Sequence, residues 1–181
     1  MMLRTLAFLA PLALALTLAS CGRGNADRAE FAAANCPAAM TVQDASRLTR
    51  FKPGPGRDPR DIVFEASLDG AAVACSLSRT QMDVDVVLRV AVSAGPSVGT
   101  GVSRVPYFVR VLNSSGVIVQ GQEFSADFRL TQANPRGLSQ EELTLRLPYT
   151  EVSQVQGFRI AVGLKPTAEE LEYNRRAAGR P

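Results

Sequence analysis

The chain has 181 residues, with 20 Lys or Arg, 17 Asp or Glu, no His and no Trp, a length that favours one domain or a small pair of domains. Without imidazole, the Ser-His-Asp and Cys-His nucleophile systems, His-ligated zinc or haem, and a histidine general base are excluded. The net charge of +3 comes from scattered basic residues, so no nucleic-acid partner is expected.

The first 20 residues have the pattern of an export signal. Arg4 is followed by an apolar run from Leu6 to Leu18, interrupted only by Pro11 and Thr17. The run has the length of a signal-peptide core and is too short to predict a membrane-spanning helix.

The sequence Leu18-Ala19-Ser20-Cys21 directly follows that run. It resembles the lipobox of bacterial lipoproteins, in which the chain is cleaved just before the Cys. The resemblance implies that Cys21 carries a thioether-linked diacylglycerol and an N-linked acyl chain such as palmitate, which together anchor a protein stably in a membrane. An ordinary secretory signal with a coincidental Cys is the alternative. In this family Asp after the Cys goes with inner-membrane retention, whereas Gly22 here implies the outer membrane, facing the periplasm.

The other two cysteines are Cys36 and Cys75. An even pair in an oxidising compartment predicts a disulfide, and two free buried thiols are the alternative. A metal site is not expected, because no further soft ligands lie nearby in the sequence.

Residues 22–35 are small, polar and rich in Ala, which predicts a flexible tether, although the alanines also allow a frayed helix. The chain is therefore divided into a signal peptide (1–20), a lipidated Cys with its tether (21–35), a folded domain (36–165) and a short helix with a basic tail (166–181).

Apolar residues in the folded domain alternate with a period of two, which is typical of half-buried strands. Asp69-Gly70 and 113–116 have the composition of hairpin turns. The expected strands cover 62–68, 73–77, 82–92, 105–111, 117–120, 124–130, 143–147 and 158–164.

Seven or eight short strands without interleaved helices predict an all-β protein, an antiparallel two-layer β-sandwich that is immunoglobulin-like in architecture. A closed barrel is the structural alternative. Thr167 and Glu170 form the pattern of a capping box, and Arg175-Arg176 suit the end of a helix. Such a short helix must pack on the sandwich or on a partner.

Two carboxylate groups are candidates for chemistry. Asp83 and Asp85 share one strand face, where they could bind a hard cation or act as an acid and base, but strand alternation explains both as a solvated face. Asp58 and Asp61 lie beside Arg57 and Arg60, which predicts ion pairs within a loop.

The segment VGLKPTAEELEYNRR (162–176) and the spacing of Cys36 and Cys75 are similar to small uncharacterised lipoproteins of alphaproteobacteria, a resemblance that implies no activity. The leading hypothesis is a lipid-anchored, non-enzymatic interaction or structural module of the envelope, with an envelope protein as partner and no cofactor or metal. One alternative is a sandwich that binds a small ligand, lipid or glycan between loops 53–61 and 131–140. Another is a carboxylate-dependent hydrolase.

Overall fold

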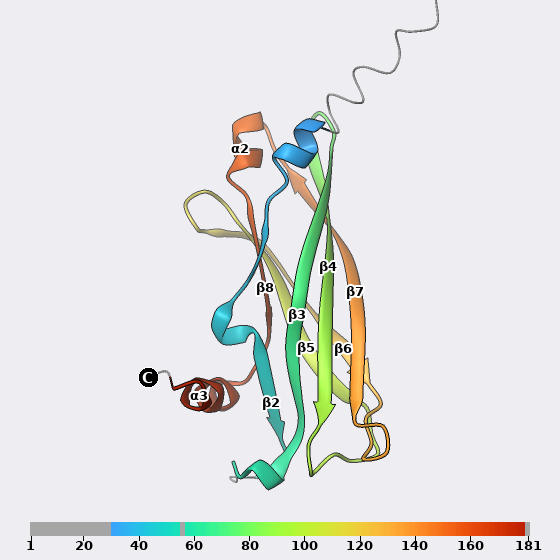
Figure 1. The fold of residues 1–181 in the computed structure, drawn as a ribbon. Coiled ribbons are helices and arrows are strands. Elements are labelled where there is room, and N and C mark those ends of the chain that lie inside the picture. Colours follow the sequence, from blue (N-terminus) through green and yellow to red (C-terminus); the bar gives the residue numbers. More distant parts are fainter. Residues whose placement is uncertain (1–29, 55–56, 180–181) are drawn as a thin grey trace, which may run out of the picture.

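The computed structural model describes residues 30–54 and 57–179, so the expected signal peptide, Cys21 and the first part of the tether lie outside the described residues. Within these ranges two four-stranded sheets pack face to face (Figure 1), which confirms the all-β sandwich. The first sheet has the order β1 (Ala39–Thr41), β8 (Arg159–Leu164), β5 (Ser103–Leu112) and β6 (Ile118–Phe128). The second has the order β2 (Arg47–Phe51), β3 (Ile62–Leu77), β4 (Gln81–Ala94) and β7 (Arg136–Pro148).

Neighbouring strands are antiparallel except for β1 and β8, which are parallel. Residues 30–34 are helical, and the helical elements after them are η1 (Gln43–Ala45), η2 (Pro59–Asp61), α2 (Val152–Gln156) and α3 (Ala168–Ala177). In the described part of the chain, no helix is long and apolar enough to cross a bilayer.

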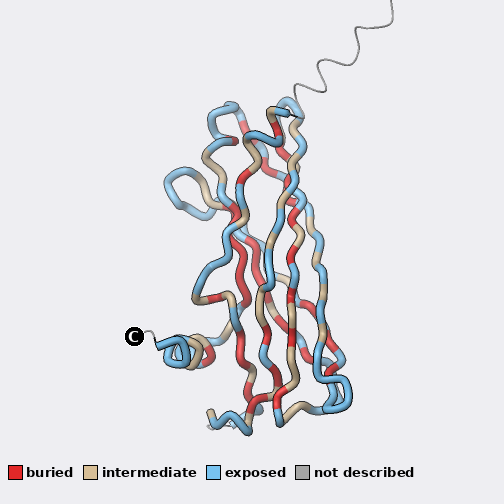
Figure 2. The backbone as a smooth tube through the Cα atoms, in the orientation of Figure 1, coloured by how far each residue is buried: buried red, intermediate tan, exposed pale blue. Residues whose placement is uncertain are grey.

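The core lies between the two sheets, and in Figure 2 buried segments (red) alternate with intermediate (tan) or exposed (pale blue) ones along the strands. Strand β4 gives the clearest case, because Met82, Val84, Val86, Leu88 and Val90 are fully buried. Each residue between them points to the other side of the sheet. The strand predicted from this alternation is therefore confirmed, and burial of its apolar side chains is the main force that holds the two layers together.

The hairpin predicted at Asp69-Gly70 is wrong. Strand β3 continues through these residues and pairs with β4 on both sides of them. Leu68 lies opposite Val90 and Gly70 lies opposite Arg89, so Asp69 is one extra residue, a β-bulge. Gly70 has φ of 148°, a conformation that favours glycine. Before the bulge the even-numbered residues of β3 point toward the core, and after it the odd-numbered residues do. In the sequence this change looks like two separate strands.

A second difference concerns β6 and β7. The strands predicted at 117–120 and 124–130 form the single strand β6, and the loop predicted at 131–140 becomes strand from Arg136 onward. Both are paired along their length, β6 with β5 and β7 with β4. The neighbouring strands β5 and β4 continue past the polar residues of β6 and β7. They offer hydrogen-bond partners for the backbone groups of these residues, which keeps them in the sheet.

The register defines two ends of the sandwich. At one end Leu77 lies opposite Met82, and Gln81 lies opposite Pro148. This end also carries α2, the turn between β5 and β6, and residues 30–38, and we call it the N-terminal end (Figure 1). The opposite end, which we call the distal end, carries the connections β2–β3, β4–β5 and β6–β7.

The predicted C-terminal helix is confirmed as α3. Its capping box is present, with the Glu170 amide donating to the Thr167 hydroxyl and the Thr167 amide donating to the Glu170 carboxylate. The helix packs on β2, where the ring of Tyr173 lies edge-on to the ring of Phe51 with 4.9 Å between the ring centroids. Glu170 is buried and pairs with Arg50 at 3.0 Å, so the helix belongs to the sandwich.

Candidate functional site

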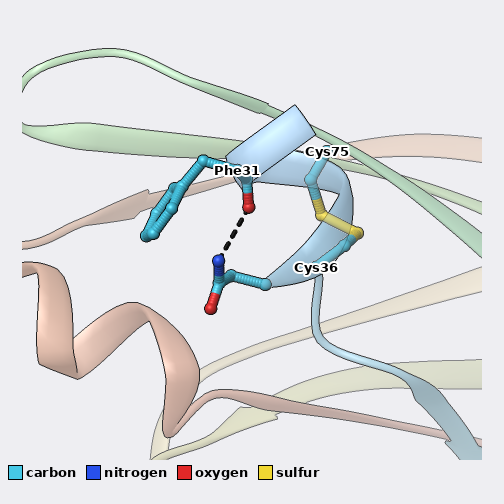
Figure 3. The surroundings of a disulfide bond; sticks show 4 residues. Phe31, Cys36 and Cys75 are labelled. Carbon is cyan, nitrogen blue, oxygen red and sulfur yellow. Dashed lines mark hydrogen bonds between the residues drawn. A yellow bond between two sulfur atoms is a disulfide. The ribbon is translucent and has the colours of Figure 1, made fainter. Parts of the chain in front are cut away.

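The N-terminal segment is fixed to the end of the sandwich. Cys36, just before β1, forms a disulfide with Cys75 of β3, with 5.6 Å between their Cα atoms (Figure 3), which confirms the predicted pair. Residues 30–34 are helical, and Ala32 is only 1% exposed. The described end of the expected tether is thus part of the folded body.

Asn35 adds two polar contacts to this attachment. Its side-chain amide donates to the carbonyl of Phe31 at 2.8 Å, the dashed bond in Figure 3. Its side-chain oxygen accepts from the Gln156 amide of α2 at 3.0 Å. The chain therefore enters the folded body at the N-terminal end, beside both the β3–β4 turn and α2.

The structure places Asp83 and Asp85 on the outer face of the second sheet. Asp83 accepts from the side-chain amide of Gln81 at 2.6 Å, and Asp85 accepts from the hydroxyl of Thr144 at 2.6 Å. Both carboxylates thus make hydrogen bonds within the sheet face. Over residues 30–54 and 57–179, no three His, Cys, Asp or Glu side chains gather as metal ligands would.

The ion pairs predicted within the Pro- and Gly-rich loop are present in part, since Asp58 pairs with Arg60 but Arg57 pairs with Glu169 of α3. Asp58 caps η2 and accepts from Arg60, and the hydrogen bonds from Arg60 lower the pKa of Asp58 below its ordinary value. Asp61 pairs with Lys52 at 2.6 Å. These contacts hold residues 58–61, which lead into β3, beside the end of β2.

The described residues of loop 53–61 and residues 131–135 lie at the distal end, where Arg60 and Gln132 contact the β4–β5 connection. Ser97 donates to the carbonyl of Arg60 at 2.7 Å, and Gln132 donates to the carbonyl of Gly95 at 3.2 Å. The β4–β5 connection thus links the two loops that sequence reasoning placed on either side of a ligand.

The two sides of the sandwich are closed differently. On one side β1 lies beside β3, the disulfide joins the layers, and α3 covers β2. On the other side β6 and β7 end their sheets and have only slight contact with each other. These strands have 11 and 13 residues, so each offers a long row of backbone groups that no described strand pairs. We call this side the open edge.

Polar side chains lie at the open edge between the layers. The Tyr107 hydroxyl donates to Glu141 of β7 at 3.1 Å, and the hydroxyl of Ser139 donates to the same carboxylate. Phe124 of β6 stacks on the Tyr107 ring at 5.4 Å. Burial, and then the Glu141 charge, raise the pKa of Tyr107 above its ordinary value, so the phenol stays protonated as a donor.

Sequence reasoning missed this cluster. Its signal is the inner face of β7, where Gly137, Ser139 and Glu141 share the phase of Leu143 and Leu145. An inward charge on an edge strand is a device by which natural sheets limit uncontrolled strand pairing. The inward-facing residues of β7 from Leu143 to Leu147 complete the core, whereas those from Gly137 to Glu141 are small or polar.

No protein-family model matches the chain, and a search among curated proteins finds no similar sequence.

Proposed function

We propose that this protein is a lipoprotein of a bacterial outer membrane, anchored through acyl chains on Cys21 and facing the periplasm. Its sandwich is a non-enzymatic module that binds an envelope protein. The lipobox-like sequence at 18–21 supports the anchor. The disulfide supports an oxidising compartment, because such bonds persist outside the reducing cytosol.

The observation that carries the binding role is the open edge. One side of the sandwich is closed, whereas β6 and β7 keep long unpaired edges. An exposed strand edge recognises an extended segment of another protein by adding it as a further strand, with backbone hydrogen bonds providing affinity. The partner is therefore expected to contribute an extended peptide segment.

Membrane anchoring assists such binding. A tethered module meets its partner in the thin layer above the membrane, and the raised effective concentration allows a modest intrinsic affinity to suffice. Asp83 and Asp85 fit a non-enzymatic role, because their carboxylates accept hydrogen bonds from Gln81 and Thr144 on the outer face of the sheet.

Photo-crosslinking in the native envelope tests the proposal. A photoreactive residue replaces Gln122 on β6 or Gln140 on β7, and the control carries it at Arg89, which is exposed on β4 and is paired with β3 on one side and β7 on the other. We expect one defined adduct from an edge position and none from Arg89. Equal labelling at all three positions, or no adduct from either edge, would refute the binding role.

The anchor has its own control. A Cys21→Ala variant should remain in the soluble fraction and should not incorporate labelled palmitate. A variant that stays membrane-bound, with the same lipid labelling as the parent, would show that Cys21 is not the anchor.

A further inference from the structure

Exposed apolar side chains gather at the N-terminal end of the sandwich. Val117, just before β6, is 58% exposed, and Ile118 and Val119, the first two residues of β6, are 49% and 52% exposed. Val152 of α2 is 50% exposed. We call these four residues the apolar tip.

The hairpin part of the apolar tip stands out from the sheet (Figures 1 and 2). Ile118 lies opposite Leu112 and Gln120 lies opposite Val111, so Val119 is an extra residue, a β-bulge, at the start of the hairpin. Because isolated apolar side chains are common on protein surfaces, it is the exposure of three consecutive apolar residues that indicates a contact surface.

The turn that carries the hairpin is well ordered. The side-chain oxygen of Asn113 accepts from the amides of Ser115 and Val117 at 3.0 and 2.9 Å. Gly116 has φ of 77° and donates its amide to the carbonyl of Asn113 at 2.9 Å. A fixed turn holds the valines and the isoleucine outward, so little conformational entropy is lost when they are buried.

The N-terminal segment, α2 and the hairpin form one continuous end. Gln156 of α2 bonds to Asn35 of the N-terminal segment. At the C-terminus of α2, a Cβ placed on Gly157 would lie 3.0 Å from the Cβ of Ser114 in the turn. The apolar tip therefore lies at the end of the body where the chain toward Cys21 leaves.

Chain length ties this end to the bilayer. Nine peptide steps separate Cys21 from Glu30, and a fully extended chain of that length spans at most about 32 Å. If Cys21 is acylated, the N-terminal end is held within that distance of the acyl chains. The distal end lies further away, because the 16 residues of β3 extend about 50 Å along the sandwich.

We propose that the apolar tip inserts into the headgroup region of the phospholipid bilayer and holds the sandwich upright on the membrane. The proposal rests on the lipid anchor at Cys21. A single anchor fixes one point only, whereas a second contact at the apolar tip fixes the orientation. The open edge then runs away from the bilayer and stays accessible to a partner along its length.

Fluorescence of the full lipidated chain in vesicles of phosphatidylethanolamine and phosphatidylglycerol tests this. An environment-sensitive dye is attached to a cysteine in Ile118→Cys. With Cys21 acylated and Cys36 bonded to Cys75, the introduced thiol is the single reactive one. Leu138→Cys is the matched control, because Leu138 is 66% exposed and lies on β7 toward the distal end.

We expect the dye at position 118 to shift its emission to the blue and to be quenched by lipid-linked nitroxide. The dye at position 138 should emit as in water and should not be quenched. A Val117→Ser/Val119→Ser variant in the Ile118→Cys background should lose most of the blue shift at position 118.

The other outcomes overturn the proposal in distinguishable ways. Acylated protein on the vesicles with the same emission at 118 and 138 would refute membrane insertion and leave the anchor intact. A blue shift at 118 in native envelopes without quenching by lipid-linked nitroxide, and no blue shift in vesicles, would assign the apolar tip to a protein partner. Absence of acyl chains from the Cys21 peptide, with the protein free of the vesicles, would refute the anchor and with it the insertion.

Discussion

Breaking the bond between Cys36 and Cys75 should lower the free energy of unfolding by about 2–4 kcal/mol. The two residues are 39 positions apart. In the chain-entropy model, closing a loop of that size removes about 13 cal/mol/K from the unfolded chain, or about 3.9 kcal/mol at 25 °C. The value is an upper bound, because unfolded chains are already compact.

Contacts that remain without the disulfide bring the expected loss in the free energy of unfolding toward the lower end of this range of about 2–4 kcal/mol. Without the disulfide the N-terminal segment is still held by burial of Ala32 and by the bond from Gln156 to Asn35. Part of the loss is therefore expected as early detachment of residues 30–38, before the sheets separate. That segment should show the largest gain in amide hydrogen exchange.

Thermal unfolding of a soluble chain that starts at Gly22 measures the effect. The Cys36→Ser/Cys75→Ser variant should melt about 10 °C below the parent, at about 2–4 °C per kcal/mol for a body of this size. A reductant should lower the parent to the variant's value and leave the variant unchanged. Equal melting temperatures for the oxidised parent and the variant would show that the bridge does not stabilise the fold.

Two further predictions concern the core and its edge. Gly95→Ala should lower the free energy of unfolding by about 1–3 kcal/mol in chemical denaturation, because the new methyl group would lie against the carbonyl of Ile62. In the control Gly99→Ala the new methyl group meets no atom within 4 Å, so the free energy of unfolding should hardly change. Equal losses in the two variants would refute the packing argument. The raised pKa of Tyr107 means that the folded state holds the phenol proton more tightly than the unfolded chain does. The contribution of Tyr107 to the free energy of unfolding is therefore fully present below about pH 10 and decreases above it by up to about 1.4 kcal/mol per pH unit. Tyr107→Phe should remove this slope in denaturation curves between pH 9.5 and 11, and an unchanged slope would mean that Glu141 and burial do not control the phenol.

The sequence predicted the strands whose alternation is strong and uninterrupted. In β4 each second residue from Met82 to Val92 is apolar, and all of them are buried. The capping box at Thr167 and Glu170 likewise predicted α3, because both of its hydrogen bonds are local. The short helix α2 was missed, although Glu151 and Gln154 carry the same kind of signal over only five helical residues.

The candidate site was predictable only in part. Sequence composition predicted the pairing of Cys36 with Cys75 and, of the loop ion pairs, that of Asp58 with Arg60, but not those of Asp61 with Lys52 and Arg57 with Glu169. It did not indicate that Tyr107 and Glu141 meet, since they lie 34 positions apart in different sheets. Nor did it indicate that the apolar residues at 117–119 remain exposed, because an apolar run looks the same whether or not another layer covers it.

Local periodicity by itself determined the strands with strong alternation and the apolar side of each, because alternation acts between neighbours along the chain; it did not predict β1, β2 or the first part of β7. Only the tertiary structure decided whether Asp69-Gly70 turns the chain or bulges within it. The sequence signal is identical for both, and the continuous partner β4, which bonds to β3 before and after Gly70, selects the bulge. Sheet order was decided in the same way, since it depends on contacts between distant segments. That order leaves β6 and β7 at the open edge and brings residues 30–38 and the apolar tip to one end of the sandwich.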